Sequence, residues 1–139
     1  MRLYLAGPMT SVPQFNIPLF DSTAAALRLL NLDIVSPAEL DNPETRRVAL
    51  ASPDGAPGSG AANGESWGDF LSRDVKLIAD QIDGLVLLPG WQKSRGARLE
   101  VFVALLCGKK FFVWSEGLYT FPRDVDAAEI RGTLRENMP

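Results

Sequence analysis

Histidine is absent from the 139-residue sequence, and cysteine occurs only once, as Cys107. Without histidine, the chain can use neither Ser-His-Asp nor Cys-His catalysis, and it cannot bind a metal through imidazole. A single cysteine also excludes an internal disulfide and a Cys-x-x-Cys zinc or redox site. Because Cys107 follows the apolar run 103–106, we expect it to fill the core. Any catalysis therefore relies on carboxylates, hydroxyls, arginine, lysine or tyrosine.

Long apolar runs and a strong excess of one charge are also missing. No segment approaches the roughly 20 apolar residues that a membrane helix needs, and the apolar stretch within residues 1–8 is too short for a signal peptide. We therefore expect a cytoplasmic protein without a membrane partner. The net charge is only −3, whereas a partner of long nucleic acid usually presents a basic face. A mononucleotide stays open as a partner, because one phosphate needs only a few local donors.

The remaining composition is typical of a globular chain, with 46% hydrophobic and 22% charged residues. The length fits one domain over residues 1–139. Residues 51–66 are rich in Gly, Ala, Ser and Pro and lack periodicity, which predicts a mobile surface loop. The hydrophobic pattern elsewhere predicts strands at 2–6, 32–35, 84–88 and 111–114, and helices from about residue 18 and at 67–79, 96–106 and 124–137. Gly108 is expected to close the third helix in a left-handed conformation.

Strands that alternate with helices predict an α/β fold with a parallel, doubly wound sheet, whose order begins 2-1-3-4. The switch point of such a sheet lies beyond the carboxyl ends of its first and third strands. Gly7, Pro8 and Met9 follow the first strand, and Trp91 lies in the loop after the third. We therefore expect these four residues to line a substrate pocket.

Residues 93–100 follow a buried strand and begin a helix, so their backbone amides are candidates for binding an anion. Ser94 adds a hydroxyl, Arg95 a positive charge, and Gly96 allows close approach to the backbone. The alternative is a glycine-containing loop that merely starts a helix.

Glu100 lies one turn inside that helix. If Leu99, Phe102, Val103 and Leu106 face the core, Glu100 projects toward the pocket; the alternative is a solvated side chain that the helix dipole favours. Asp74, on the helix before, is either surface charge or the second carboxylate that glycosidic chemistry requires. Tyr4, on the first strand, belongs either to the core or to the pocket wall.

Taken together, three segments resemble the nucleoside 2-deoxyribosyltransferase superfamily. They are 4–8 (Tyr-Leu-Ala-Gly-Pro), Arg73-Asp74, and Ser94-x-Gly96-x-x-x-Glu100. Within it, the chain looks most similar to the 2′-deoxynucleoside 5′-monophosphate N-glycosidases and their short phage and bacterial relatives. The resemblance covers roughly residues 1–50 and 65–115.

The resemblance implies a flavodoxin-like, three-layer fold with four to five strands and a covalent mechanism. Glu100 would attack C1′ of the sugar, Asp74 would position the sugar or protonate the base, and Tyr4 would orient the nucleophile. Water, or a second base, would then take the sugar. No metal and no organic cofactor is needed.

Ser94 favours one branch of the superfamily. The nucleoside-specific transferases tend to carry an acid six residues before the nucleophile, whereas the monophosphate hydrolases carry serine. A hydroxyl beside Lys93 and Arg95 suits a 5′-phosphate, which a carboxylate would repel. The bulky Trp91 and Arg98 depart from the best-known members and leave the base and sugar preference open.

The resemblance also implies a homodimer, since the superfamily commonly completes its site with a residue from the neighbouring subunit. The apolar segment Phe112–Phe121 is the candidate contact. Two other functions stay open: a nucleotide-binding protein without turnover, and a structural interaction protein.

Overall fold

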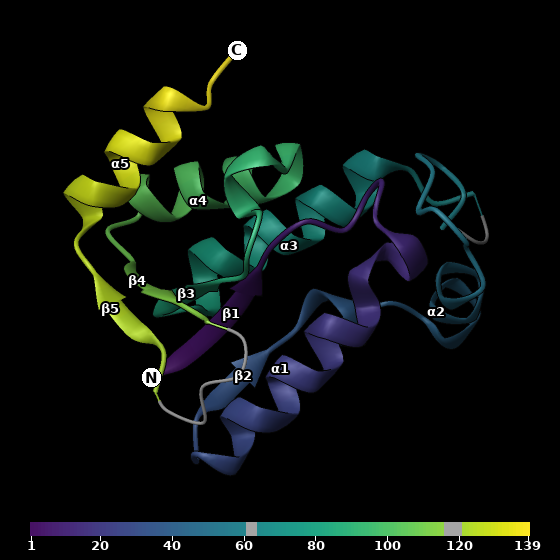
Figure 1. Ribbon diagram of the computed structural model, residues 1–139, viewed down its shortest axis with the longest axis horizontal. Coiled ribbons are helices and arrows are strands. Elements are labelled where there is room, and N and C mark those ends of the chain that lie inside the picture. The colour runs from purple at the N-terminus through teal and green to yellow at the C-terminus, as the bar shows by residue number, and fades with distance from the viewer. Residues whose placement is uncertain (61–63, 116–120) are drawn as a thin grey trace.

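The computed structural model describes residues 1–60, 64–115 and 121–139. Figure 1 shows a central sheet with helices on both sides. The strands are β1 (Arg2–Ala6), β2 (Asp33–Val35), β3 (Gly84–Leu87), β4 (Lys110–Val113) and β5 (Arg123–Val125). The α-helices are α1 (Ile17–Leu29), α2 (Pro43–Leu50), α3 (Trp67–Gln81), α4 (Arg95–Leu106) and α5 (Ala127–Glu136), with short 3-10 turns at Pro13–Asn16, Pro37–Glu39 and Trp91–Lys93.

The strand order is β2-β1-β3-β4-β5, and the first four strands run parallel. This confirms the α/β class and the predicted order at its start, and the arrangement is that of a flavodoxin-like fold. β5 differs from a fully parallel sheet, because it pairs antiparallel with β4. Val125 faces Phe111 in this pairing and both are buried.

Two apolar layers enclose the sheet. On one face, α1 packs through Ile17, Phe20 and Leu27 onto Leu5 and Val86. On the other, α3, α4 and α5 cover Tyr4, Leu85 and Phe111, so successive side chains of β1 point to opposite layers. α2 and the segment before α3 lie at one end of the molecule, and α5 lies at the opposite end (Figure 1).

Most element boundaries agree with the sequence prediction, but two segments do not. Residues 123–125 form β5, so the last helix begins after its N-cap Asp126, whose side chain accepts from the Ala128 N–H at 2.7 Å. Helix α2 was not predicted. No helix within the described ranges is long and apolar enough to cross a membrane.

The predicted core face of α4 is wrong. Leu99, Phe102 and Leu106 are exposed, and Val103 is only half-buried. The face on the sheet carries smaller residues and one carboxylate: Ala97, Glu100, Val101 and Ala104. Both sets recur at helical spacing, so spacing alone could not choose between them. Glu100 therefore enters the site from the buried face of the helix.

The end of α4 gives one confirmed and one wrong prediction. Gly108 adopts φ +67°, the left-handed conformation expected after the helix. Cys107 is exposed, not in the core. The chain leaves α4 at this residue and turns through Gly108 toward β4, so the thiol lies outside the buried stripe of the helix.

Candidate active site

A cavity of about 700 Å³ lies beside the carboxyl end of β1, at the predicted switch point. Its walls come from the β1–α1 connection, from α3 and from the first turn of α4. Residues between α2 and α3, among them Pro57, Gly58 and Gly60, add a further wall. Glu100 and Asp74 both line this one cavity, so the two carboxylates belong to one site.

Strand β1 of the sheet holds the Glu100 side chain in place through one hydrogen bond. The Tyr4 hydroxyl, from the middle of β1, donates to Glu100 Oε2 at 2.5 Å. Tyr4 is fully buried and Glu100 is 7% exposed. The phenol therefore fixes one carboxylate oxygen, and the other oxygen has no donor among the described residues.

Asp74 sits in an ion-pair network. Arg73 Nε donates to Asp74 Oδ1 at 2.9 Å, and Arg73 Nη1 donates to Asp41 Oδ1 at 2.8 Å. Arg73 Nη2 also reaches the Pro37 carbonyl at 3.5 Å. One guanidinium thus ties α3 to the segment that precedes α2.

Burial governs the protonation of this cluster. It raises the pKa of Glu100 to about 8, an effect that the nearby charge of Asp74 reinforces and that Tyr4 and Arg73 oppose. Burial also raises the pKa of Asp74, against the opposing effect of Arg73. The pKa of Tyr4 lies well above its usual value, again because of burial and the two carboxylates. At neutral pH this cluster therefore favours one protonated and one ionised carboxyl group.

The first turn of α4 forms the polar side of the cavity. Ser94 caps the helix by accepting from the Ala97 N–H at 3.2 Å. The N–H groups of Arg95 and Gly96 have no acceptor within the described residues, and both residues line the cavity. A Cβ on Gly96 would meet nothing within 4 Å. These groups can receive an anion, as helix N-termini commonly do.

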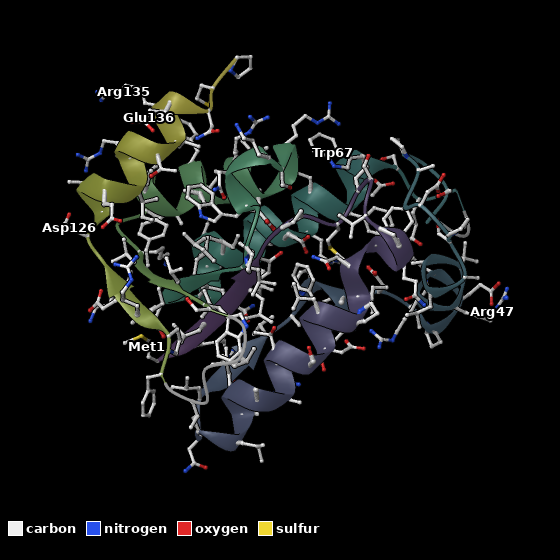
Figure 2. The ribbon with its side chains drawn as sticks, viewed as in Figure 1. Met1, Arg47, Trp67, Asp126, Arg135 and Glu136 are labelled. Carbon is white, nitrogen blue, oxygen red and sulfur yellow. The ribbon has the colours of Figure 1, made fainter. Side chains whose placement is uncertain are left out.

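An aromatic wall stands beside that turn. The Arg95 guanidinium lies 3.9 Å from the centroid of the Trp67 ring, which joins the start of α4 to the start of α3. In Figure 2, Trp67 lies at the N-terminal end of α3, where the chain arrives from α2. Phe70 and Phe15 line the same cavity. A planar base can pack against such a wall.

The connection after β1 is shaped by the segment 51–60. Gln14, Phe15 and Asn16 have positive φ angles, and Ser11 N donates to the Gly55 carbonyl at 2.7 Å. Gly55 also has φ +66°, and a Cβ there would lie 2.1 Å from the Val12 carbonyl oxygen. Residues 51–60 of the segment predicted as a mobile loop therefore pack closely on the residues that lead into α1; the mobility of the segment stays a prediction.

Most of the predicted site residues meet at this cavity. Besides Glu100 and Asp74, the lining includes Gly7, Met9, Ser94, Arg95 and Gly96, and Tyr4 reaches the site through its hydroxyl. Two predicted residues are not among the described residues that line it. Trp91 is 7% exposed and packs in the core beneath α4. Pro8 offers its carbonyl to Asn16 Nδ2 at 2.8 Å.

The sequence reasoning missed Asp41 and Glu65. Asp41 pairs with Arg73 across 32 positions in sequence, and nothing local marks such a partner. Glu65 accepts from the Thr45 hydroxyl and from Asn42 Nδ2, both at the start of α2. Because α2 was not predicted, no signal pointed to this contact.

Fold and site together define a doubly wound α/β protein with a carboxylate-containing cavity at its switch point. A family model described as a domain of unknown function, DUF4406, matches residues 1–113. The chain therefore belongs to this family. The matched range contains Tyr4, Asp74 and Glu100 and ends before β5. No curated protein matches the sequence.

Proposed function

We propose that the protein cleaves the N-glycosidic bond of a nucleoside 5′-monophosphate, by hydrolysis or by transfer of the sugar to another base. The observation that carries the proposal is the meeting of Glu100, Asp74 and the Tyr4 hydroxyl at one cavity. Two carboxyl groups around one sugar are what retaining glycosidic chemistry requires.

In this proposal Glu100 is the nucleophile. The oxygen that Tyr4 does not hold attacks C1′ and forms a glycosyl ester, while Asp74 supplies the proton that the departing base needs. Tyr4 fixes the rotamer of Glu100 during the attack. Water, or a second base, then attacks C1′ and frees Glu100. These steps require no metal and no organic cofactor.

The first turn of α4 is the proposed phosphate site. The unpartnered N–H groups of Arg95 and Gly96 and the Ser94 hydroxyl face a cavity that Lys93 also lines. These groups favour a nucleoside monophosphate over a free nucleoside. The aromatic wall of Trp67 and Phe70 is the surface against which the base would pack.

A homodimer in the cytoplasm is the proposed form of the protein. The predicted contact lies in Phe112–Phe121, of which residues 116–120 fall outside the described ranges. Phe121 is 64% exposed. Phe102 and Leu106 on α4, together with Met138, add a second exposed apolar surface beside α5.

The direct test is incubation with a panel of ribo- and deoxyribonucleoside monophosphates and the matching nucleosides, followed by chromatography for free base. We expect base release from at least one monophosphate, and at least 10³-fold less (on the order expected for loss of a nucleophile) from Glu100→Ala. If no substrate releases base, or if Glu100→Ala releases it equally fast, the proposed function is wrong.

One observation favours a second candidate, a nucleotide-binding protein without turnover. Burial raises the pKa of Glu100 to about 8, and a protonated carboxyl group is not a nucleophile. Binding would then need the α4 N-terminus but not Glu100. Unchanged nucleotide affinity in Glu100→Gln, with no base released by either protein, would support this candidate.

A further inference from the structure

This inference rests on the proposed function and concerns how the two carboxyl groups share a proton. Of the two carboxyl groups, Arg73 forms an ion pair with Asp74 but not with Glu100. Its guanidinium bonds Asp74 at 2.9 Å and Asp41 at 2.8 Å, and the two acids are only 12% and 11% exposed. The same guanidinium lies over the Phe70 ring, 5.7 Å from its centroid. Arg73 is therefore held in place by two ion pairs and one aromatic ring.

Glu100 has a different environment. Its one hydrogen bond within the described residues comes from the neutral Tyr4 hydroxyl, and it forms no ion pair with any described residue. The charged and titratable groups that act on it are Asp74 and Arg73 from α3 and Tyr4 from β1. Lys93, Arg95 and Glu65 line the same cavity but pair with neither carboxyl group. The positive charge is thus placed asymmetrically, on the Asp74 side.

We propose that Arg73 is a positioning residue that keeps the proton of the carboxyl pair on Glu100 in the resting protein and keeps Asp74 ionised. Two buried carboxyl groups in one cavity do not both ionise readily at neutral pH. The ion pair with Arg73 stabilises the charge on Asp74, and such a charge-assisted contact is stronger than the hydrogen bond that the neutral Tyr4 hydroxyl donates to Glu100. Tyr4 lowers the pKa of both carboxyl groups and so does not reverse this preference.

This placement supplies the reaction with its proton. When substrate occupies the cavity, Glu100 transfers its proton to the Asp74 carboxylate, and the ionised Glu100 attacks C1′. The C1′–N bond breaks, its electron pair goes to the base nitrogen, and the base takes the proton from Asp74. The base leaves neutral, and no proton enters from solvent.

The second half restores the starting state. Water attacks C1′, the ester bond to Glu100 breaks with its electron pair on the carboxylate, and Asp74 accepts the proton of the water. That proton then returns to Glu100, because Arg73 again favours the ionised form of Asp74. The water proton therefore replaces the one that left with the base, and the carboxyl pair again holds a single proton at the end of the cycle.

The test is a carboxyl ¹³C NMR titration of the substrate-free protein, with Glu and Asp labelled. In the wild type, Glu100 is expected to titrate at higher pH than Asp74. Arg73→Lys keeps a charge and is expected to keep that order. Arg73→Gln removes a charge that lowers the pKa of both groups. It is expected to raise the titration midpoint of Asp74 by more than that of Glu100, because only Asp74 is ion-paired with Arg73, and so to reverse the order. Among the described residues, the exposed Arg47 forms an ion pair with its helical neighbour Glu44 alone, so Arg47→Gln is the matched control and leaves both midpoints unchanged.

The wild-type titration alone can overturn the proposal, even if Arg73→Gln does not fold, since Asp74 titrating above Glu100 contradicts it. The same order in Arg73→Gln as in the wild type also contradicts it. Where base release is measured, we expect Arg73→Gln to lower kcat by about 100-fold and to alter the pH profile, with KM nearly unchanged. Absence of base release from the wild type would contradict the proposed function. The titration would still decide whether Arg73 determines which carboxyl group holds the proton.

Discussion

Tyr4 and Glu100 lie 96 positions apart in the sequence, and the Tyr4 hydroxyl donates a 2.5 Å hydrogen bond to the Glu100 carboxyl group. The contact links β1, an inner strand of the sheet, to the buried face of α4. It connects an otherwise ordinary core tyrosine to the group that the proposed chemistry needs.

Tyr4→Phe removes the hydroxyl but keeps the ring in the core. Because the Tyr4 hydrogen bond lowers the pKa of Glu100, its loss raises that pKa further. We expect kcat/KM to fall by about 10- to 100-fold and its alkaline limb to move to higher pH. Stability should change by less than about 1.5 kcal/mol, as measured by urea unfolding. An unaltered pH profile would show that the hydroxyl does not act on Glu100.

The raised pKa of Glu100 also predicts how stability depends on pH. Between the ordinary value of 4.5 and about 8, the folded protein binds a proton at Glu100 that the unfolded chain has lost. The stabilisation is therefore complete below about pH 4.5 and is lost as the pH rises through about 8. The shift of Asp74 has the same sign.

Glu100→Gln isolates this contribution, because glutamine cannot lose a proton. We expect the unfolding free energy of the wild type to fall, relative to Glu100→Gln, by about 2–4 kcal/mol between about pH 5 and pH 9. Urea unfolding of both proteins across this range is the measurement. Parallel curves would mean that Glu100 titrates normally.

Ser94→Asp tests the phosphate site without removing the helix cap, because aspartate caps helices as well as serine does. The added charge should repel a 5′-phosphate at the start of α4 and raise KM for monophosphates by about 10- to 100-fold. KM for free nucleosides should change little. Ser94→Asn is the neutral control of equal shape. Equal effects of both variants on monophosphates would place the phosphate elsewhere.

Gly7 marks the close approach of the β1 end to the residue after β3. A Cβ at Gly7 would lie 2.7 Å from Leu88 Cβ, so Gly7→Ala should destabilise the fold by about 1–3 kcal/mol. Gly132, within α5, has open space around its Cβ position. Gly132→Ala should therefore stabilise by about 0.5–1 kcal/mol. Urea unfolding compares the two, and equal effects would contradict the packing argument.

The sequence was informative where local pattern and topology act together. Continuous apolar runs such as 84–88 predict buried parallel strands, and the crossover rule then places β1 beside β3. That placement located the cavity and the start of α4. The left-handed conformation of Gly108 was predictable, because glycine adopts a positive φ without steric cost and few other residues do.

The rest depended on contacts that no local pattern encodes. The residues of α4 form two helical stripes, and the larger apolar one, with Phe102 and Leu106, turned out to be exposed. The Asp41–Arg73 pair joins distant segments. Trp91 follows a strand at the switch point, yet its ring packs in the core. Sequence order predicts which loops meet, but not which side chains of those loops face the cavity.

The central claim is that Glu100 forms a bond with the sugar, and mass spectrometry of the trapped protein tests it most directly. A substrate with fluorine at C2′ slows both steps by destabilising the cationic transition state and lets the ester accumulate. After acid quench and proteolysis, the peptide that contains Glu100 is expected to gain the mass of the sugar phosphate, and Glu100→Gln is expected to gain none. Release of base with no adduct, or with the sugar on Asp74, would contradict the account.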